Sequence, residues 1–174
     1  LVVGLVTGGL YALLIALGWG YNLGLKSSLA SGVMYLLGFG LLPTYAASTL
    51  PGHPAARWPV TVAAALLGLG AHFANVLPDL AVDKATGVDG LPQRVAALWG
   101  PGAVRAVALA LLLMASVLLL LGATRRWVAI PGLIAALLLA VASARGTGRV
   151  PFLAAIGIAA VDIAVFAAGG EALS

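Results

Sequence analysis

The sequence predicts an all-α protein, a polytopic transmembrane helical bundle with about six membrane spans. The chain is 63% hydrophobic and only 8% charged, whereas soluble domains average about 25% charged residues. Its apolar residues also fall into long runs, and a helix needs roughly 20 predominantly apolar residues to cross a bilayer. We therefore expect one transmembrane domain over residues 1–174, in contact with lipid.

Six segments have the length and hydropathy that a membrane span requires. They are apolar nearly all round, whereas the surface helices of soluble proteins have a polar face. Each segment must be helical, because lipid offers no partner for a bare peptide group. The predicted spans are Val2–Tyr21, Ser31–Ser48, Trp58–Leu77, Ala103–Leu121, Trp127–Ala144 and Pro151–Ala168.

Glycines recur along these spans, and small residues let membrane helices approach each other closely. We expect this role for Gly4, Gly8 and Gly9 in the first span. We expect it also for Gly68 and Gly70 in the third.

Charge lies mostly in the connections and predicts the orientation of the bundle. Connections one, three and five share one side of the membrane. Together with Arg105, that side holds six of the nine cations, and Arg57, Arg125 and Arg126 lie on the other. An excess of Lys and Arg marks the cytoplasmic side. The composition, rich in Ala, Gly and Leu, favours a multi-pass protein of a bacterial inner membrane.

Three of the five acidic residues lie in a short segment that follows the third span. Asp79 and Asp83 are four residues apart, so they share a helical face if the third span continues past Leu77. Two like charges so placed repel each other, and a divalent cation would offset the repulsion. Mg²⁺ is commonly held by one or two carboxylates together with substrate phosphates. The spacing is therefore compatible with a magnesium site facing the cytoplasm.

Further polar residues extend this segment in both directions. His72 and Asn75 continue the same helical face backwards, and a polar stripe on an apolar helix marks a cavity. Cationic side chains that follow the carboxylates can bind phosphate oxygens. Gly87 and Gly90 allow turns that bring the segment back over such a site.

Each of these residues also has a simpler interpretation. The two carboxylates can be solvated charges at the membrane surface, and His72 and Asn75 can be hydrogen-bonded contacts between helices. Tyr21 and Lys26 suit an interfacial anchor and a snorkelling cation. Asp162 lies midway along the last span, where a charge is costly. It is either a cavity or relay group, or a hydrogen-bonded helix contact.

The run N-V-L-P-D-L-A-V-D-K-A-T-G-V-D-G-L-P-Q-R-V resembles a known sequence motif. It is similar to the second aspartate-rich motif of the UbiA superfamily of intramembrane prenyltransferases, the 4-hydroxybenzoate polyprenyltransferase-like enzymes. Tyr21–Ser28 resembles the Tyr/Lys segment of that family, and Gly38–Pro43 resembles its fifth helix. The motif positions that match are Asn75, Asp79, Asp83, Gly87, Leu91, Pro92 and Arg94.

The resemblance implies a fold of nine transmembrane helices around a cavity open to the cytoplasm and to lipid. The six spans of this chain would be the fourth to the ninth. The first three helices and the first aspartate-rich motif of the family have no counterpart in it, and Leu1 lies inside an apolar run. The chain is then either part of a complete enzyme or a truncated product that is inactive alone.

The resemblance also implies Mg²⁺-dependent transfer of a prenyl group inside the membrane. The partners would be an isoprenyl diphosphate, an acceptor of the aromatic or quinone-precursor type, and the lipid bilayer. The sequence predicts no nucleic acid and no protein partner. By resemblance, Asp79 and Asp83 would be catalytic and would bind the metal; Lys26, Lys84 and Arg94 would bind the diphosphate; and Tyr21, His72 and Asn75 would line the substrate cavity.

Two alternatives to a prenyltransferase remain at this point. The chain can be a fragment of a transporter or channel, with Asp162 and His72 lining a polar path together with Asp79. It can also be a non-catalytic remnant that binds lipid or a partner. The clustering of charge at one membrane face favours the enzyme.

Overall fold

The computed structural model describes residues 4–52 and 55–168, and the chain is all-helical over these residues. Six of the helices are long and apolar enough to cross a membrane, which confirms the predicted transmembrane bundle. Three short elements lie in the connections. In chain order the elements are α1 (Leu5–Asn22), the 3-10 turn η1 (Leu25–Ser27), α2 (Ala30–Ser48), α3 (Trp58–Val76), α4 (Leu80–Thr86), α5 (Leu91–Trp99), α6 (Pro101–Gly122), α7 (Arg126–Arg145) and α8 (Val150–Ala168).

The observed spans follow the predicted ones closely. Apart from the start of the first span, where residues 1–3 lie outside the described residues, each predicted end is within two residues of the observed one. Proline explains the starts of α5 and α6, because each has a proline in its first two positions. At the start of a helix the N–H that proline lacks would have no partner within the helix, and the fixed φ of proline suits the helical conformation.

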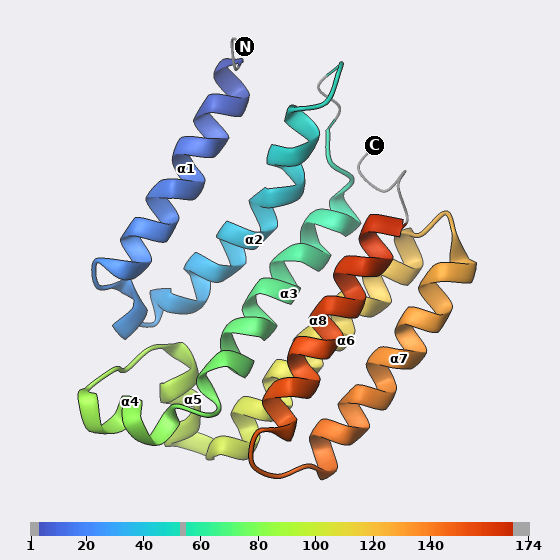
Figure 1. Cartoon of the computed structure of the whole chain (residues 1–174). Helices are drawn as coiled ribbons and strands as arrows, with labels where there is room; N and C mark the ends of the chain where they lie inside the picture. Colours follow the sequence, from blue (N-terminus) through green and yellow to red (C-terminus); the bar gives the residue numbers. More distant parts are fainter. Residues whose placement is uncertain (1–3, 53–54, 169–174) are drawn as a thin grey trace.

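The long helices form a row and a cluster that meet at α3 (Figure 1). Helices α1, α2 and α3 lie side by side, and α6, α7 and α8 pack together on the far side of α3. Leu112 of α6 and Ile158 of α8 are fully buried in this cluster. Helix α1 packs on α2 and η1 and buries only Thr7, whose hydroxyl donates to the Ser48 carbonyl at 3.1 Å.

Close helix contacts confirm the glycine prediction for α3 but not for α1. A Cβ on Gly68 would lie 2.4 Å from Phe39 of α2, and one on Gly70 would lie 2.9 Å from Leu112 of α6. At Gly4, Gly8 and Gly9 a Cβ would meet nothing within 4 Å. That part of the prediction is wrong, because these glycines face away from α2, whereas Thr7 on the same part of α1 contacts it.

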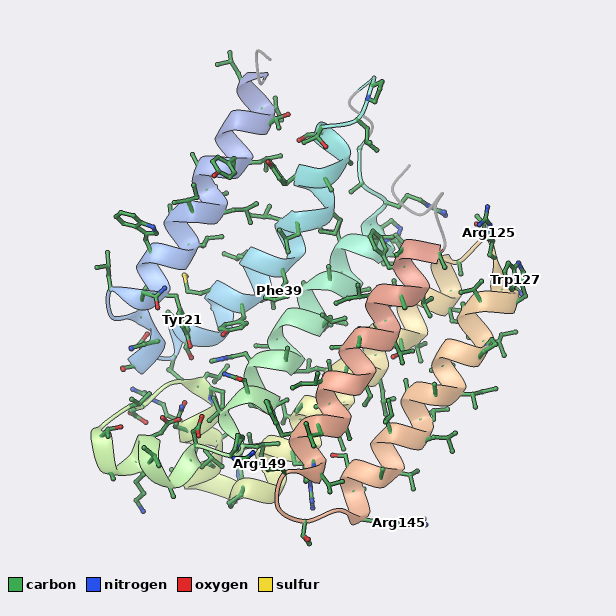
Figure 2. The ribbon with its side chains drawn as sticks, viewed as in Figure 1. Tyr21, Phe39, Arg125, Trp127, Arg145 and Arg149 are labelled. Atoms are coloured by element: carbon green, nitrogen blue, oxygen red, sulfur yellow. The ribbon has the colours of Figure 1, made fainter. Side chains whose placement is uncertain are left out.

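Charged groups divide between the two ends of the bundle. Arg145 and Arg149 lie at the end that carries α4 and α5, and Arg125 and Trp127 lie at the opposite end (Figure 2). Arg105, at the start of α6, donates to the carbonyls of Ser143 at 3.4 Å and Gly146 at 3.3 Å. The cation thereby satisfies carbonyls at the C-terminal end of α7.

We expect Gly68→Ala to destabilise the bundle, because the new methyl group must displace Phe39 near its backbone. Overpacking of this kind costs about 1–3 kcal/mol. Gly8→Ala is the matched control, since its Cβ meets open space and alanine favours a helix. Thermal melting of the full chain in detergent should show a lower midpoint for Gly68→Ala only. Equal midpoints for the two variants would contradict the close α2–α3 contact.

Candidate functional site

Helix α3 ends at Val76 and does not continue past Leu77. Pro78 is responsible, since proline has no N–H to donate to the carbonyl four residues earlier and its ring clashes with that carbonyl. The chain leaves the helix in tight turns, in which Leu77 donates to Ala74 at 3.2 Å and Asp79 donates to Val76 at 3.0 Å. The acidic residues therefore belong to a separate short helix, α4, so the condition that the third span continues past Leu77 is not met.

Asp79 and Asp83 are nevertheless one helical turn apart. Asp79 is the N-cap of α4, and its carbonyl accepts the N–H of Asp83 at 2.8 Å. The Asp79 carboxylate makes no capping hydrogen bond and has no side-chain partner among the described residues. It is therefore free to bind a ligand instead of its own helix.

Both carboxylates line one pocket at this end of the bundle, between the ends of α1, α3 and α4. Its volume is about 180 Å³. Six of the eight predicted site residues line it, and we call it the acidic pocket. Its lining residues are Tyr21, Lys26, His72, Asn75, Val76, Asp79, Asp83, Val88 and Gln93.

Two predicted phosphate-binding cations do not line the acidic pocket. Lys84 is exposed on α4. The Arg94 guanidinium pairs with the Asp89 carboxylate at 3.0 Å and also donates to the Asp89 carbonyl at 3.2 Å. Both partners of this ion pair are about half exposed, at 42% and 57%. Lys26, in η1, is the one cation of the predicted set that faces the two carboxylates.

The Ser31 hydroxyl, at the start of α2, holds the wall of the acidic pocket together. It accepts the backbone N–H of Leu91, the first residue of α5, at 2.9 Å. It also lies 3.2 Å from Nε2 of His72 in α3. Ser31 is fully buried, so it ties three helices at one point. It thereby supplies a partner for one of the helix-start N–H groups that α5 cannot satisfy itself.

Gly87 and Gly90, both predicted to allow turns, are needed for different reasons. Gly87 ends α4 with φ +75°, a left-handed conformation that glycine adopts readily. Gly90 has φ −75°, so it is not required for a turn. A Cβ there would lie 2.6 Å from the Lys26 carbonyl and 2.9 Å from the Ser31 hydroxyl oxygen. Gly90 is needed because η1 and α2 approach the backbone closely at this position.

His72 is buried, with 2% of its surface exposed, and its ring stacks on Tyr35 at a centroid distance of 4.2 Å. Because Ser31 already accepts from Leu91, its single hydroxyl hydrogen is available for Nε2 of His72. In that arrangement the ring proton of His72 lies on Nδ1; with the proton on Nε2 instead, His72 would donate to the second lone pair of Ser31. Nδ1 is buried and has no partner among the described residues.

Gln93 supplies a second unpartnered atom beside the carboxylates. Its Nε2 donates to Asp83 at 2.7 Å. Its Oε1 is buried without a hydrogen-bond partner in the described part of the chain. Buried polar atoms in proteins are almost always paired. Two such atoms at one pocket therefore call for a polar partner, such as an ordered water or a polar ligand.

No family model, no curated protein and no solved structure matches this chain. The site is consequently interpreted from its own residues and geometry.

Two apolar spaces adjoin the acidic pocket. A groove of about 450 Å³ runs between α1 and α2, lined by Leu14, Leu17 and Gly38 among others, and it shares Tyr21 with the acidic pocket. We call it the α1–α2 groove. A cavity of about 280 Å³ lies among α2, α3 and α8; it includes Phe152 and shares Asn75. We call it the α3–α8 cavity.

Three residues of the site were not predicted from the sequence. Ser31 and Tyr35 shape the wall, and Gln93 binds Asp83. A serine or tyrosine near a helix end carries no signal by itself. The polar side chain of Gln93, one turn before the mostly apolar end of α5, was the only available indication.

Ser31→Ala should loosen the start of α5, because the Leu91 N–H then lacks an acceptor; leaving a buried donor unsatisfied costs about 1–3 kcal/mol. Hydrogen–deuterium exchange of the full chain in nanodiscs should show faster exchange at Leu91. Ser27→Ala is the control, since Ser27 is exposed and makes no side-chain hydrogen bond with the described residues. Unchanged Leu91 exchange in Ser31→Ala would contradict the role of Ser31.

Proposed function

We propose that this chain forms part of an intramembrane prenyltransferase that resembles the UbiA superfamily. The reaction would transfer a prenyl group from an isoprenyl diphosphate to an acceptor of the aromatic or quinone-precursor type. The observation that carries the proposal is the convergence of six predicted site residues on one acidic pocket. This pocket opens between two apolar compartments, an arrangement suited to a charged head group with a long apolar chain.

The donor atoms of the acidic pocket fit a magnesium ion. Asp79 and Asp83 supply carboxylate oxygens, Asn75 supplies an amide, and the buried Oε1 of Gln93 has no protein partner. The described residues contain no group of three or more acidic or histidine ligands. Mg²⁺ is typically bound by one or two carboxylates and completes its shell with water and substrate phosphates. When bound, Mg²⁺ supplies Lewis-acid stabilisation of charge on the diphosphate.

The residues of the pocket have distinct roles in the proposed reaction. Lys26 binds a phosphate oxygen and favours the charge that builds up as the allylic carbon–oxygen bond breaks. The electron pair of that bond leaves with the diphosphate. The acceptor forms the new bond to the prenyl carbon and loses a proton. Tyr21 and His72 close the pocket toward the bilayer and keep water from the cationic carbon.

The two apolar compartments support a reaction between two membrane-soluble substrates. The α1–α2 groove is the larger and meets the acidic pocket at Tyr21, so we assign it to the prenyl chain. The α3–α8 cavity meets the pocket at Asn75, so we assign it to the acceptor. Both substrates then approach the carboxylates from the lipid side.

The same end of the bundle is proposed to face the cytoplasm of a bacterial cell. It carries Arg145 and Arg149, whereas Arg125 lies at the opposite end (Figure 2). The transporter alternative has weaker support. His72 and Asp162 line separate pockets, and the second of these is otherwise apolar. A continuous polar path between them would require further polar groups.

Asp79→Asn and Asp83→Asn should each lower prenyl transfer by the complete protein on the order of a hundredfold, because each removes one charge that holds the metal and diphosphate. The measurement is turnover of an isoprenyl diphosphate at saturating Mg²⁺. Lys26→Ala should raise KM for the donor.

Asp89→Asn and Lys84→Ala are the matched controls for these variants. Asp89 is exposed and paired with Arg94, and Lys84 is exposed outside the pocket. Both controls should retain activity close to that of the unmodified protein. Activity retained in Asp79→Asn and Asp83→Asn as well would rule out the acidic pocket as the site of prenyl transfer.

A further inference from the structure

A further pocket lies between α2, α3, α6 and α8. It has a volume of about 250 Å³ and is lined by apolar side chains, among them Phe39, Val60, Leu119 and Phe166. Asp162 is the only polar residue in its lining. We call it the Asp162 pocket. Asp162 lies twelve residues after the first residue of α8, about 18 Å along the helix from the end that carries the acidic pocket.

Asp162 is almost fully buried and only half satisfied. Its exposed fraction is 2%. The Ser116 hydroxyl of α6 lies 2.7 Å from Oδ1, while Oδ2 has no hydrogen-bond partner in the described part of the chain. No cation pairs with it there, since the ion pair identified among the described residues joins Arg94 and Asp89. Leaving a buried acceptor unsatisfied carries the full desolvation penalty of that group.

A helix contact alone does not explain this arrangement. Ser116 lies within hydrogen-bonding distance of two acceptors, Oδ1 of Asp162 and the Leu112 carbonyl at 3.2 Å, and it has a single hydrogen. Ser116 thus fixes one carboxyl oxygen, while Oδ2 of this pocket-lining residue has no partner among the described residues. Oδ2 has a free lone pair whether the hydrogen in the 2.7 Å contact belongs to Ser116 or to Oδ1 of Asp162.

The size and lining of the pocket restrict what can satisfy Oδ2. An apolar cavity of about 150 Å³ holds a benzene molecule, so 250 Å³ accommodates a ring with a substituent. A lipid tail would fill the space but leave Oδ2 unpaired. A cation would have to leave water for an otherwise apolar site, which is expensive. A neutral apolar molecule with one hydroxyl group would both fill the space and pair with Oδ2, and Phe39 and Phe166 add aromatic side chains to the lining.

We propose that the Asp162 pocket binds a small hydrophobic alcohol or phenol, whose hydroxyl group donates a hydrogen bond to Oδ2 of Asp162. Ser116 positions the carboxyl group for this contact. The site is distinct from the acidic pocket, and the proposal stands whether or not the chain transfers prenyl groups. An aromatic stack connects the two sites, because Phe39 stacks on Tyr35 at 6.0 Å and Tyr35 stacks on His72.

The test uses 4-fluorophenol and 4-fluorotoluene, which differ only by a methyl group in place of the hydroxyl. Binding to the full chain in phosphatidylcholine nanodiscs is followed by ¹⁹F NMR, and protein-free nanodiscs correct for partition into lipid. We expect saturable binding of 4-fluorophenol. We expect at least tenfold weaker binding of 4-fluorotoluene, which cannot donate to Oδ2.

Two substitutions separate the hydrogen bond from packing. Asp162→Asn keeps an oxygen acceptor for the ligand and an N–H group for Ser116, so affinity for the phenol should stay within about threefold. Asp162→Leu keeps the approximate size without an acceptor, so affinity should fall at least tenfold; tenfold corresponds to about 1.4 kcal/mol. Asp79→Asn should leave phenol binding unchanged. Gel filtration checks that every variant keeps its fold.

Several results would overturn the proposal. They are the absence of saturable phenol binding, equal binding of the two probes by the unmodified chain, and unchanged phenol binding in Asp162→Leu. The comparison of the two probes needs no variant, so it decides the question even if Asp162→Leu fails to fold. Loss of phenol binding in Asp79→Asn, with the fold retained, would place the bound phenol in the acidic pocket instead.

Discussion

The hydrogen bonds of Ser31 are the interaction on which the candidate site depends. One buried hydroxyl holds the start of α5 and the end of α3 against α2. The contact requires Gly90, where a side chain would collide with the Lys26 carbonyl. This arrangement brings the segment after α4 back over the helix ends. In the same segment Gln93 reaches Asp83 and lines the acidic pocket.

Pro78 supplies the second constraint. A continuous α3 would carry the acidic residues on away from the bundle along its own axis. The break lets α4 begin anew with Asp79 as its N-cap, so that both carboxylates line a pocket with Lys26. The other polar groups of this end lie there because water can form hydrogen bonds with them and lipid cannot. Charge therefore gathers where the bundle meets water, and the apolar spaces lie toward the membrane interior.

Much of this architecture is predictable from the sequence, because hydropathy alone determines where spans can lie. The spacing of Asp79 and Asp83 survives the helix break, since four residues still make one turn of α4. Sequence alone did not predict that Lys84 and Arg94 lie outside the acidic pocket, because an exposed cation can point into solvent or pair with a nearby exposed carboxylate, as Arg94 does with Asp89. Gly8 and Gly68 look alike in sequence, yet only Gly68 faces a neighbouring helix. The role of Ser31 could not be predicted from the sequence, because its partners His72 and Leu91 are 41 and 60 residues away.

The central claim is that the acidic pocket holds a divalent cation together with a diphosphate. Mn²⁺ suits the same oxygen ligands as Mg²⁺, and its unpaired electrons broaden nearby NMR signals. The most direct measurement adds Mn²⁺ and inorganic pyrophosphate to the full chain and observes the side-chain amide signals of Asn75 and Gln93. We predict selective broadening of both signals, which disappears in Asp79→Asn and Asp83→Asn. Broadening that is absent, or that persists unchanged in both variants, would contradict the account.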